Sequence, residues 1–326
     1  MSKRSKRKNN LKESIILLLL LIVLLVSSTY AWFTANQTVT ISTIDVTIEA
    51  SNGLQISTDA TKWKAILLNE DITSGAYSGN KNELPISMVP VSTVGTIDSN
   101  GFMEMYKGTV SANASNGRYE LTAVKVEEQT SHFIAFDIFL KVDAPTALQL
   151  TEASYVRASE NSTDKGIKQA SRVAFVIQGR KEAGASVGEI TSLTASEDSP
   201  LYIWEPNANL HTSAAVSHAR DTYGITTSSD GNAEAISYFG IKNAITEPVE
   251  LSRTAGQDTT NFAAVTPTYV TLADENGKIT APKNIFSLEA GVTKVRMYMW
   301  IEGQDIDCEN AASGTDIAFN VQFSVV

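Results

Sequence analysis

Hydrophobic and polar residues alternate along several segments of the chain, which is the pattern of β-strands with one buried face. The clearest alternation lies at residues 295–302 and 317–325. In the second of these, the residues of the apolar face are Ile317, Phe319, Val321, Phe323 and Val325. In the segment 172–178, the five central residues from Val173 to Ile177 are all apolar, which predicts a strand covered on both faces.

The segment 133–142 alternates as well, and we predict that it is a half-buried strand. Its apolar face consists of Ile134, Phe136, Ile138, Leu140 and Val142. Asp137 and Lys141 fall on the opposite face. Because Asp and Lys are almost never fully buried without a partner, this second face is expected to meet water.

A strand near the N-terminus changes phase in its middle. Its apolar residues are Val39 and Ile41 in one phase, and Ile44, Val46 and Ile48 in the other. A slip of one residue turns side chains to the opposite face, so we expect a bulge or break at Ser42–Thr43. The dipeptide Asn52–Gly53 is a strong turn signal, and it predicts that residues 54–57 return beside residues 46–48 as a hairpin.

Helices are expected to be a minor component. Residues 165–170 suit a short helix that begins after Ser162 or Asp164. Long loops are predicted where Ser, Thr, Asn and Gly accumulate, at residues 75–82, 99–101, 111–117, 184–199 and 212–232. Many strands with few helices favour an all-β fold, an antiparallel β-sandwich of jelly-roll type. We expect one elaborated sandwich over residues 32–326, and two smaller sandwiches that meet within 180–235 are the alternative.

The first 31 residues have the pattern of a secretory signal peptide. Six basic residues within positions 3–12 precede an apolar run from Ile15 to Val26, and small residues follow at Thr29 and Ala31. This order predicts a signal helix that is cleaved after Ala31, so that Trp32 becomes the new N-terminus. The alternative is an anchor that is kept, because the largely apolar stretch continues through Phe33 and approaches the length of a bilayer span.

Composition narrows the choice of partners. The chain has 326 residues with 26 basic and 36 acidic side chains, and removal of the leader leaves 20 basic against 35 acidic ones. Such a surface repels nucleic acids and anionic lipids, so we expect neither as a partner, and the membrane only through the N-terminal segment before cleavage. The single cysteine, Cys308, excludes an internal disulfide. An exported chain without disulfides fits a bacterial surface.

One acidic cluster suggests a cation site. Its members are Glu302, Asp305, Asp307 and Glu309. Calcium takes six to eight oxygen ligands, and closely spaced carboxylates in a turn supply several of them. The spacing differs from that of an EF-hand loop, and acids solvated in a loop are the alternative. No other cofactor is expected.

Signals of catalysis are weak. The sequence around Ser186 matches G-x-S-x-G, and Asp198, His211 and His218 follow in the order of a hydrolase. A nucleophile elbow needs a strand directly before the serine and a helix directly after it, and the sequence predicts neither. His211 and His218 lack a third metal ligand, and Cys308 is expected to be a buried, inert thiol. We therefore predict that the protein is not an enzyme.

Four sequence segments resemble one family of secreted proteins. They are Thr29–Thr34 (TYAWFT), Asn52–Ser57 (NGLQIS), Phe133–Leu140 (FIAFDIFL) and Trp300–Cys308 (WIEGQDIDC). Together they resemble the TasA/camelysin-like proteins of Gram-positive bacteria, which carry a SipW-type leader. The resemblance implies a jelly-roll fold, processing by a dedicated signal peptidase, and assembly with copies of itself into extracellular matrix fibres.

These observations leave three functional hypotheses. The first is a structural subunit of a surface fibre or biofilm matrix, in which residues 32–48 act as an exchangeable donor strand that pairs with the next subunit. An ordinary first strand within its own domain is the alternative for that segment. The second hypothesis is an adhesin whose loops bind a glycan or host ligand, with Tyr202 and Trp204 as stacking candidates. The third is a pilin-like subunit that keeps its apolar N-terminal helix.

Overall fold

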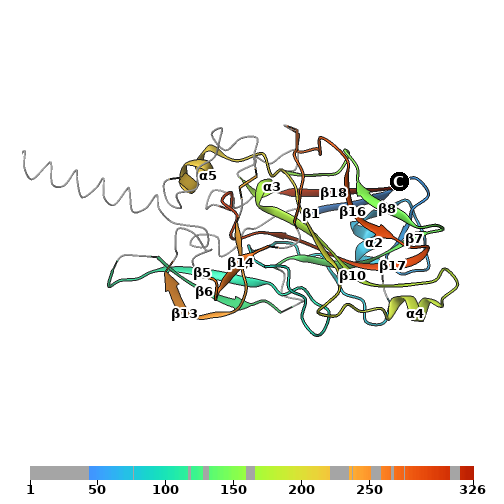
Figure 1. The fold of residues 1–326 in the computed structure, drawn as a ribbon, viewed down its shortest axis with the longest axis horizontal. Coiled ribbons are helices and arrows are strands. Elements are labelled where there is room, and N and C mark those ends of the chain that lie inside the picture. Colours follow the sequence, from blue (N-terminus) through green and yellow to red (C-terminus); the bar gives the residue numbers. More distant parts are fainter. Residues whose placement is uncertain are drawn as a thin grey trace, which may run out of the picture.

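The computed structural model describes residues 44–75, 77–116, 119–127, 132–158, 166–220, 235–236, 238–250, 258–265, 268–274, 276–308 and 316–326. These residues form an all-β sandwich of two large sheets, with two smaller sheets and a few short helices (Figure 1). The prediction of an all-β sandwich from the alternating segments is confirmed.

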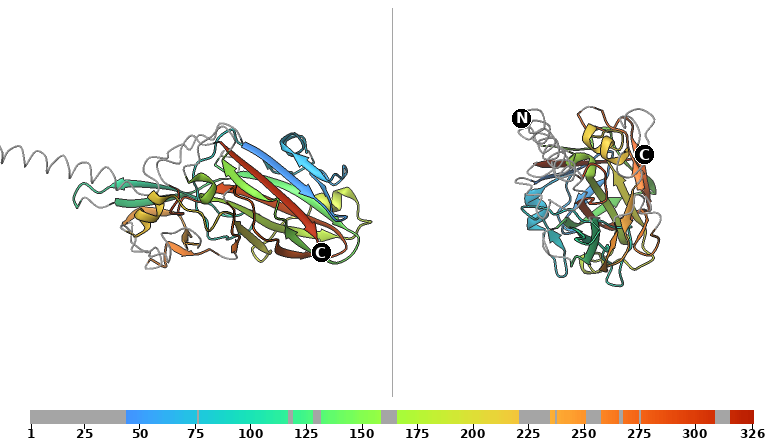
Figure 2. Two further views of the ribbon diagram at one scale, coloured as in Figure 1. Left: turned by 90° about the horizontal axis from the view of Figure 1, so that it is seen from above. Right: turned by 90° about the vertical axis from the view of Figure 1, so that its left-hand side faces the viewer.

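The first large sheet joins both ends of the described chain. Its order is β16 (Lys283–Leu288), β8 (Thr146–Leu150), β18 (Ile317–Val325), β1 (Ile44–Ala50) and β3 (Ile66–Leu68), and β9 (Tyr155–Ala158) also pairs with β18. Strands β1 and β18 run parallel, from Ile44 opposite Ile317 to Ala50 opposite Phe323. Figure 2 shows these two strands side by side.

The second large sheet contains the most deeply buried strands. Its order is β15 (Thr268–Val270), β11 (Leu201–Glu205), β10 (Ser171–Lys181), β17 (Gly291–Ile301), β7 (Ile134–Val142) and β2 (Gln55–Ser57), and β4 (Asn82–Glu83) also pairs with β7. All 11 residues of β17 are buried. The predicted strands at 172–178, 295–302 and 317–325 therefore correspond to β10, β17 and β18.

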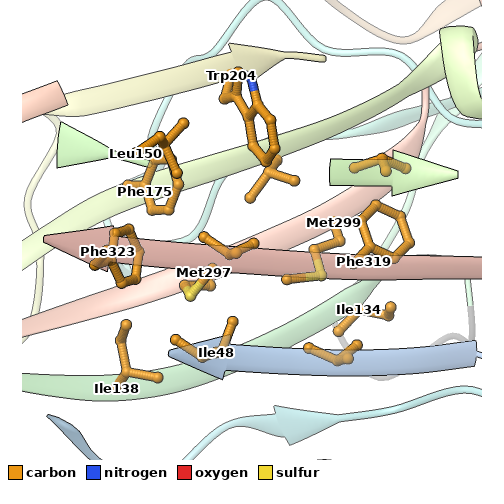
Figure 3. Packing of buried hydrophobic residues seen from close by; sticks show 14 of the residues in the cluster. Ile48, Ile134, Ile138, Leu150, Phe175, Trp204, Met297, Met299, Phe319 and Phe323 are labelled. Atoms are coloured by element: carbon orange, nitrogen blue, oxygen red, sulfur yellow. The ribbon is translucent and has the colours of Figure 1, made fainter. Parts of the chain in front are cut away.

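The main core lies between the two large sheets. Figure 3 shows Ile48 and Phe323 of the first sheet together with Met297 of the second. The other face of the second sheet is covered too, because Tyr298 and Trp300 pack in a separate apolar cluster. The second sheet therefore has no water-exposed face along its central strands, which explains why β17 is buried throughout.

The strand predicted at residues 133–142 is present as β7, but the expected exposure of Asp137 is wrong. Asp137 on β7 has 0% of its surface exposed. Its carboxylate accepts hydrogen bonds from Arg296 on the neighbouring strand, Nε to Oδ1 at 2.8 Å and Nη2 to Oδ2 at 3.1 Å. Lys294 Nζ lies 3.7 Å from Oδ2, and the Tyr77 hydroxyl donates to the same oxygen. These donors replace the water that the alternation pattern led us to expect.

An end lobe extends from one end of the sandwich. It comprises a three-stranded sheet, β13 (Ile245–Glu250), β6 (Tyr119–Lys125) and β5 (Tyr106–Ala112), with the pair β12 (Phe239–Ile241) and β14 (Phe262–Ala264) and helix α5 (Ser213–His218). Its own apolar cluster includes Leu121, Ile241 and Phe262. Ile306, from the turn after β17, belongs to the same cluster. The end lobe therefore packs directly against the turn that holds the predicted acidic site.

The predicted hairpin after Asn52–Gly53 is wrong in its pairing. The turn itself is present, with positive φ at both residues (58° and 86°). However, β2 pairs with β7 of the second sheet, and β1 pairs with β3 and β18 of the first. The turn thus carries the chain from one sheet to the other. The predicted break at Ser42–Thr43 lies outside the described residues.

Several short helices differ from the predictions. The helix predicted at residues 165–170 is α3 (Ile167–Ala170), which begins after Gly166, and both Ser162 and Asp164 lie outside the described residues. Helices α4 (Val187–Thr191) and α5 occupy parts of the predicted loops 184–199 and 212–232. Helix α2 (Asn69–Ser74) follows β3 and has no counterpart in the predictions. Each has only four to six residues, too few for a periodic pattern to identify.

Gly240 gives a test of how the end lobe docks on the sandwich. A Cβ at this position would lie 2.0 Å from the Thr93 carbonyl oxygen. The substitution Gly240→Ala is therefore expected to reduce the free energy of unfolding by about 1–3 kcal/mol, measured by urea denaturation. At Gly184 an added Cβ meets no atom within 4 Å, so Gly184→Ala is the matched control. Equal stability of the two variants would contradict this close packing.

Candidate functional site

The predicted acidic site lies in the turn that follows β17. Glu302, Asp305 and Asp307 are all buried, with 0%, 4% and 1% of their surfaces exposed. Glu309 lies outside the described residues. The alternative prediction of loop acids in solvent is therefore wrong for these three residues, because the end lobe and β10 cover the turn.

Each oxygen of the three carboxylates already has a protein partner. The carboxylate of Glu302 accepts hydrogen bonds from Gln304 N (3.0 Å) and Trp300 Nε1 (3.1 Å). That of Asp305 accepts from Asp307 N (2.8 Å) and from Arg172 Nη2. One oxygen of Asp307 accepts from Thr212 N (2.9 Å), and the other lies 2.6 Å from His211 Nδ1. A calcium ion needs such oxygens as its own ligands. Within the described ranges, no group of three or more His, Cys, Asp and Glu side chains has an arrangement suited to a metal ion. The calcium prediction therefore gains no support from these residues.

Arg172 of β10 is the centre of this buried network. Its guanidinium is completely buried; Nη2 contacts Glu205 Oε1 at 2.8 Å and also Asp305, while Nη1 donates to the Gln169 carbonyl at 2.7 Å. Its Cζ lies 5.0 Å from the centre of the Tyr238 ring in the segment leading to β12. Although burial lowers the pKa of Arg172, Glu205 and Asp305 raise it well above its ordinary value. The arginine is therefore a permanent cation that joins two strands, the turn and the end lobe.

The acids of this network outnumber its cations. Burial raises the pKa of Glu302 to about 7, against hydrogen bonds from Ser92 and Trp300 that lower it. Burial also raises the pKa of Asp307 to about 6, and Asp305 adds to this effect while His211 opposes it. Burial raises the pKa of Glu205 as well. Glu302, Asp307 and Glu205 therefore hold protons more tightly than ordinary carboxylates do.

The predicted assembly strand divides into two parts. Ile44, Val46 and Ile48 are buried in the main core of their own chain, on a strand paired along its whole length with β18. Val39 and Ile41 lie outside the described residues, as do Ala31 and Trp32 at the predicted cleavage site. The second half of the segment is thus an internal strand, and strand donation stays a prediction for the first half.

The edges of the two large sheets differ in how they are covered. Beside the start of β1, the Asn69 side chain takes the place of a neighbouring strand, since its Oδ1 accepts from Val46 N at 2.8 Å and its Nδ2 donates to Ile44 O at 2.9 Å. The outer edge of β7 is paired with β2 and β4. By contrast, in the described part of the chain no strand pairs with the outer edge of β16.

Ser186 has a structural role in its own helix. It is the N-cap of α4, where its hydroxyl donates to Glu189 Oε2 at 2.7 Å and accepts from Glu189 N at 3.3 Å. The expectation that no helix follows this serine is wrong. However, α4 and α5 lie at opposite ends of the molecule (Figure 1). The G-x-S-x-G match therefore encodes a capping box, and helix α5, which contains His218, is remote from it.

Of the two aromatic residues considered for glycan stacking, Trp204 belongs to the interior and Tyr202 is half-buried against the main core. Trp204 is fully buried, and its Nε1 donates to Thr271 Oγ1 at 2.8 Å. Tyr202 stacks on Phe286, with 5.2 Å between the ring centres. Cys308 is a buried free thiol, as predicted, and burial raises its pKa well above the ordinary value. Trp204 and Cys308 therefore supply no exposed surface, and the ring of Tyr202 is already stacked on Phe286.

Sequence reasoning missed the partners of the acidic turn. Arg172 and Glu205 lie in strands more than 90 residues before it, and local spacing does not connect them. A signal was nevertheless present, because Arg172 and Arg296 are charged residues directly beside apolar residues of predicted strands. Such a charge indicates a buried partner of opposite sign.

Comparison of the chain with protein-family models, curated proteins and solved structures gives no match. Among the described residues, no helix combines the length and apolar character needed to cross a bilayer.

Proposed function

We propose that this chain is an exported structural subunit of an extracellular fibre or biofilm matrix, and that it assembles with copies of itself by β-strand addition. Three features support the proposal. The leader has the pattern of a signal peptide, the body is an all-β sandwich, and four segments resemble the TasA/camelysin-like secreted proteins.

The observation that carries the proposal is the outer edge of β16, with which none of the described strands pairs. This strand has six residues, and its side chains Ile285 and Leu288 are anchored in the main core. An edge strand with unpaired backbone groups can accept a further strand, whose main-chain hydrogen bonds provide affinity. Strand β3, at the other edge of the same sheet, has only three residues and leads directly into α2. We therefore assign β16 as the acceptor.

The donor in this proposal is the segment 32–41 of a second copy. It contains the β-prone residues Val39 and Ile41, and it precedes β1, which is fixed in its own core. Because the donor and acceptor surfaces differ, the contact is head-to-tail, and a head-to-tail contact that does not close produces a filament.

Negative-stain microscopy of the secreted chain at rising concentration tests this function. We expect regular filaments from the intact chain, and dispersed particles with unchanged circular dichroism after deletion of residues 32–41. Mass spectrometry of the secreted chain gives its N-terminus. A start at Trp32 agrees with the fibre subunit, whereas a start near residue 13 favours the pilin-like alternative. Filaments that persist after the deletion would refute strand donation.

Photo-crosslinking tests the acceptor separately. A benzophenone amino acid at Ser287, an exposed residue of β16, is expected to crosslink to residues 32–41 of another copy. The matched control places the same group at Ser111, an exposed residue of edge strand β5 in the end lobe. Filaments with no crosslink from Ser287 would show that another edge accepts the donor.

A further inference from the structure

A groove lies between the turn at residues 98–102 and the end of β6. Its volume is about 340 Å³, at the lower end of the range of small-molecule sites. Phe102, Met103 and Val126 supply its apolar lining. Met103 and Val126 are buried and Phe102 is half-buried, so the floor of the groove exposes mainly Phe102.

The remaining lining is polar and balanced in charge. It consists of Lys81, Asp98, Asn100, Lys125 and Glu127. Lys125 Nζ lies 2.7 Å from Glu104 Oε1 and 3.4 Å from Asp98 Oδ2, so its charge is matched within the wall. Two ammonium groups, two carboxylates and one amide offer both donors and acceptors without favouring an ion of either sign.

The walls of the groove are fixed before any ligand arrives. Asp98 Oδ1 accepts from Asn100 N at 2.9 Å and from Phe102 N at 3.1 Å, which closes the turn. Gly101 has φ of +81°, and a Cβ there would lie 2.6 Å from the Ala195 carbonyl oxygen, so only glycine fits. The Arg296 guanidinium and the Lys81 ammonium each lie 5.1 Å from the centre of the Phe102 ring, and both contacts help to hold the ring in place. A rigid site loses less entropy on binding.

We propose that this groove binds a pyranose unit of a polysaccharide. A pyranose ring has an apolar face of C–H groups and a rim of hydroxyls that both donate and accept hydrogen bonds. The apolar floor and the neutral, mixed donor and acceptor rim match these two parts. This binding function goes beyond assembly, because it would attach the subunit to the glycan of a matrix or cell surface through residues separate from β16.

The variant that tests the proposal is Asn100→Ala. Asn100 is exposed, and the turn uses its backbone N–H, so the substitution removes the side-chain amide and keeps the fold. The chain contains a matched control in the turn 274–277, where Asn276 N donates to Asp274 Oδ1 at 2.9 Å and Gly277 has φ of +78°. Both turns read Asp-x-Asn-Gly, and Asn276 does not line the groove.

The experiment screens the secreted chain on a glycan array and then titrates the best neutral saccharide by calorimetry. We expect saturable binding that falls about tenfold in Asn100→Ala, as for the loss of one hydrogen bond, and that is unchanged in Asn276→Ala. The zwitterionic dipeptide Lys-Glu is titrated in parallel. Binding of no saccharide, equal binding by both variants, or binding of the dipeptide alone would each overturn the proposal. None of these results depends on filament formation.

Discussion

Replacement of Arg172 by methionine is expected to lower the free energy of unfolding by about 3–5 kcal/mol. The substitution keeps an unbranched side chain of similar length, but it leaves Glu205 and Asp305 without their shared cation in a buried site. An uncompensated buried charge is far costlier than a lost surface pair. Urea denaturation at pH 7.5, followed by circular dichroism and tryptophan fluorescence, measures the change.

Two further variants separate charge from packing. Lys64 pairs with Asp71 near the surface, where its side chain is 45% exposed, so Lys64→Met is expected to cost about 0–1 kcal/mol. If burial of unpaired acids is the cause, adding Glu205→Gln and Asp305→Asn to the Arg172→Met chain restores much of the stability. A loss in Arg172→Met no greater than that in Lys64→Met would show that Arg172 does not hold the turn in place.

The sequence predicted the long strands well because each buries an unbroken set of apolar side chains. In β18 the inward residues from Ile317 to Phe323 follow period two without a fault, and the strand bounds agree with the alternation. The same holds for the apolar run in β10. Local patterning was sufficient here, since burial of one or both faces alone decides the conformation.

Pairing between strands was not accessible to the same reasoning. The turn at Asn52–Gly53 was identified, yet β2 crosses to β7 while β1 pairs with β18, about 270 residues away in the chain. A turn signal fixes the direction of the backbone over four residues, whereas the partner is chosen by how two sheets pack. Both β1 and β2 would bury apolar residues whether they paired as a hairpin or joined different sheets. The alternation therefore does not distinguish these two arrangements.

Charged residues were misread for a related reason. Asp137 was expected in water, and the acids of the turn after β17 at a cation site or in water, because no protein partner is visible nearby in the sequence. Their partners are Arg296, Arg172 and His211, each brought close by the sheet or the end lobe. An acid beside apolar residues indicates solvent or a buried cation equally well, and only the fold decides between them.

The stability of this protein is expected to fall as the pH rises from about 5 to 8. Burial raises the pKa of Glu302 from its ordinary 4.5 to about 7. The folded state therefore binds a proton more tightly than the unfolded state. This contribution is complete below pH 4.5 and is lost as the pH passes 7. Asp307, whose pKa burial raises to about 6, acts in the same direction. Thermal unfolding at pH 5, 6, 7 and 8 measures the effect.

Glu302→Gln removes the largest part of this dependence. The amide keeps the size of the side chain and needs no proton, so the variant is expected to be more stable than the parent at pH 8, by on the order of 3 kcal/mol, and similar to it at pH 5. The control is Glu289→Gln, which removes the same charge from an exposed position. Arg172 keeps its charge throughout this range, so the gain reports the carboxyl alone. If Glu302→Gln is instead destabilising at pH 8, its hydrogen bonds from Trp300 and Gln304 outweigh the cost of burying the charge.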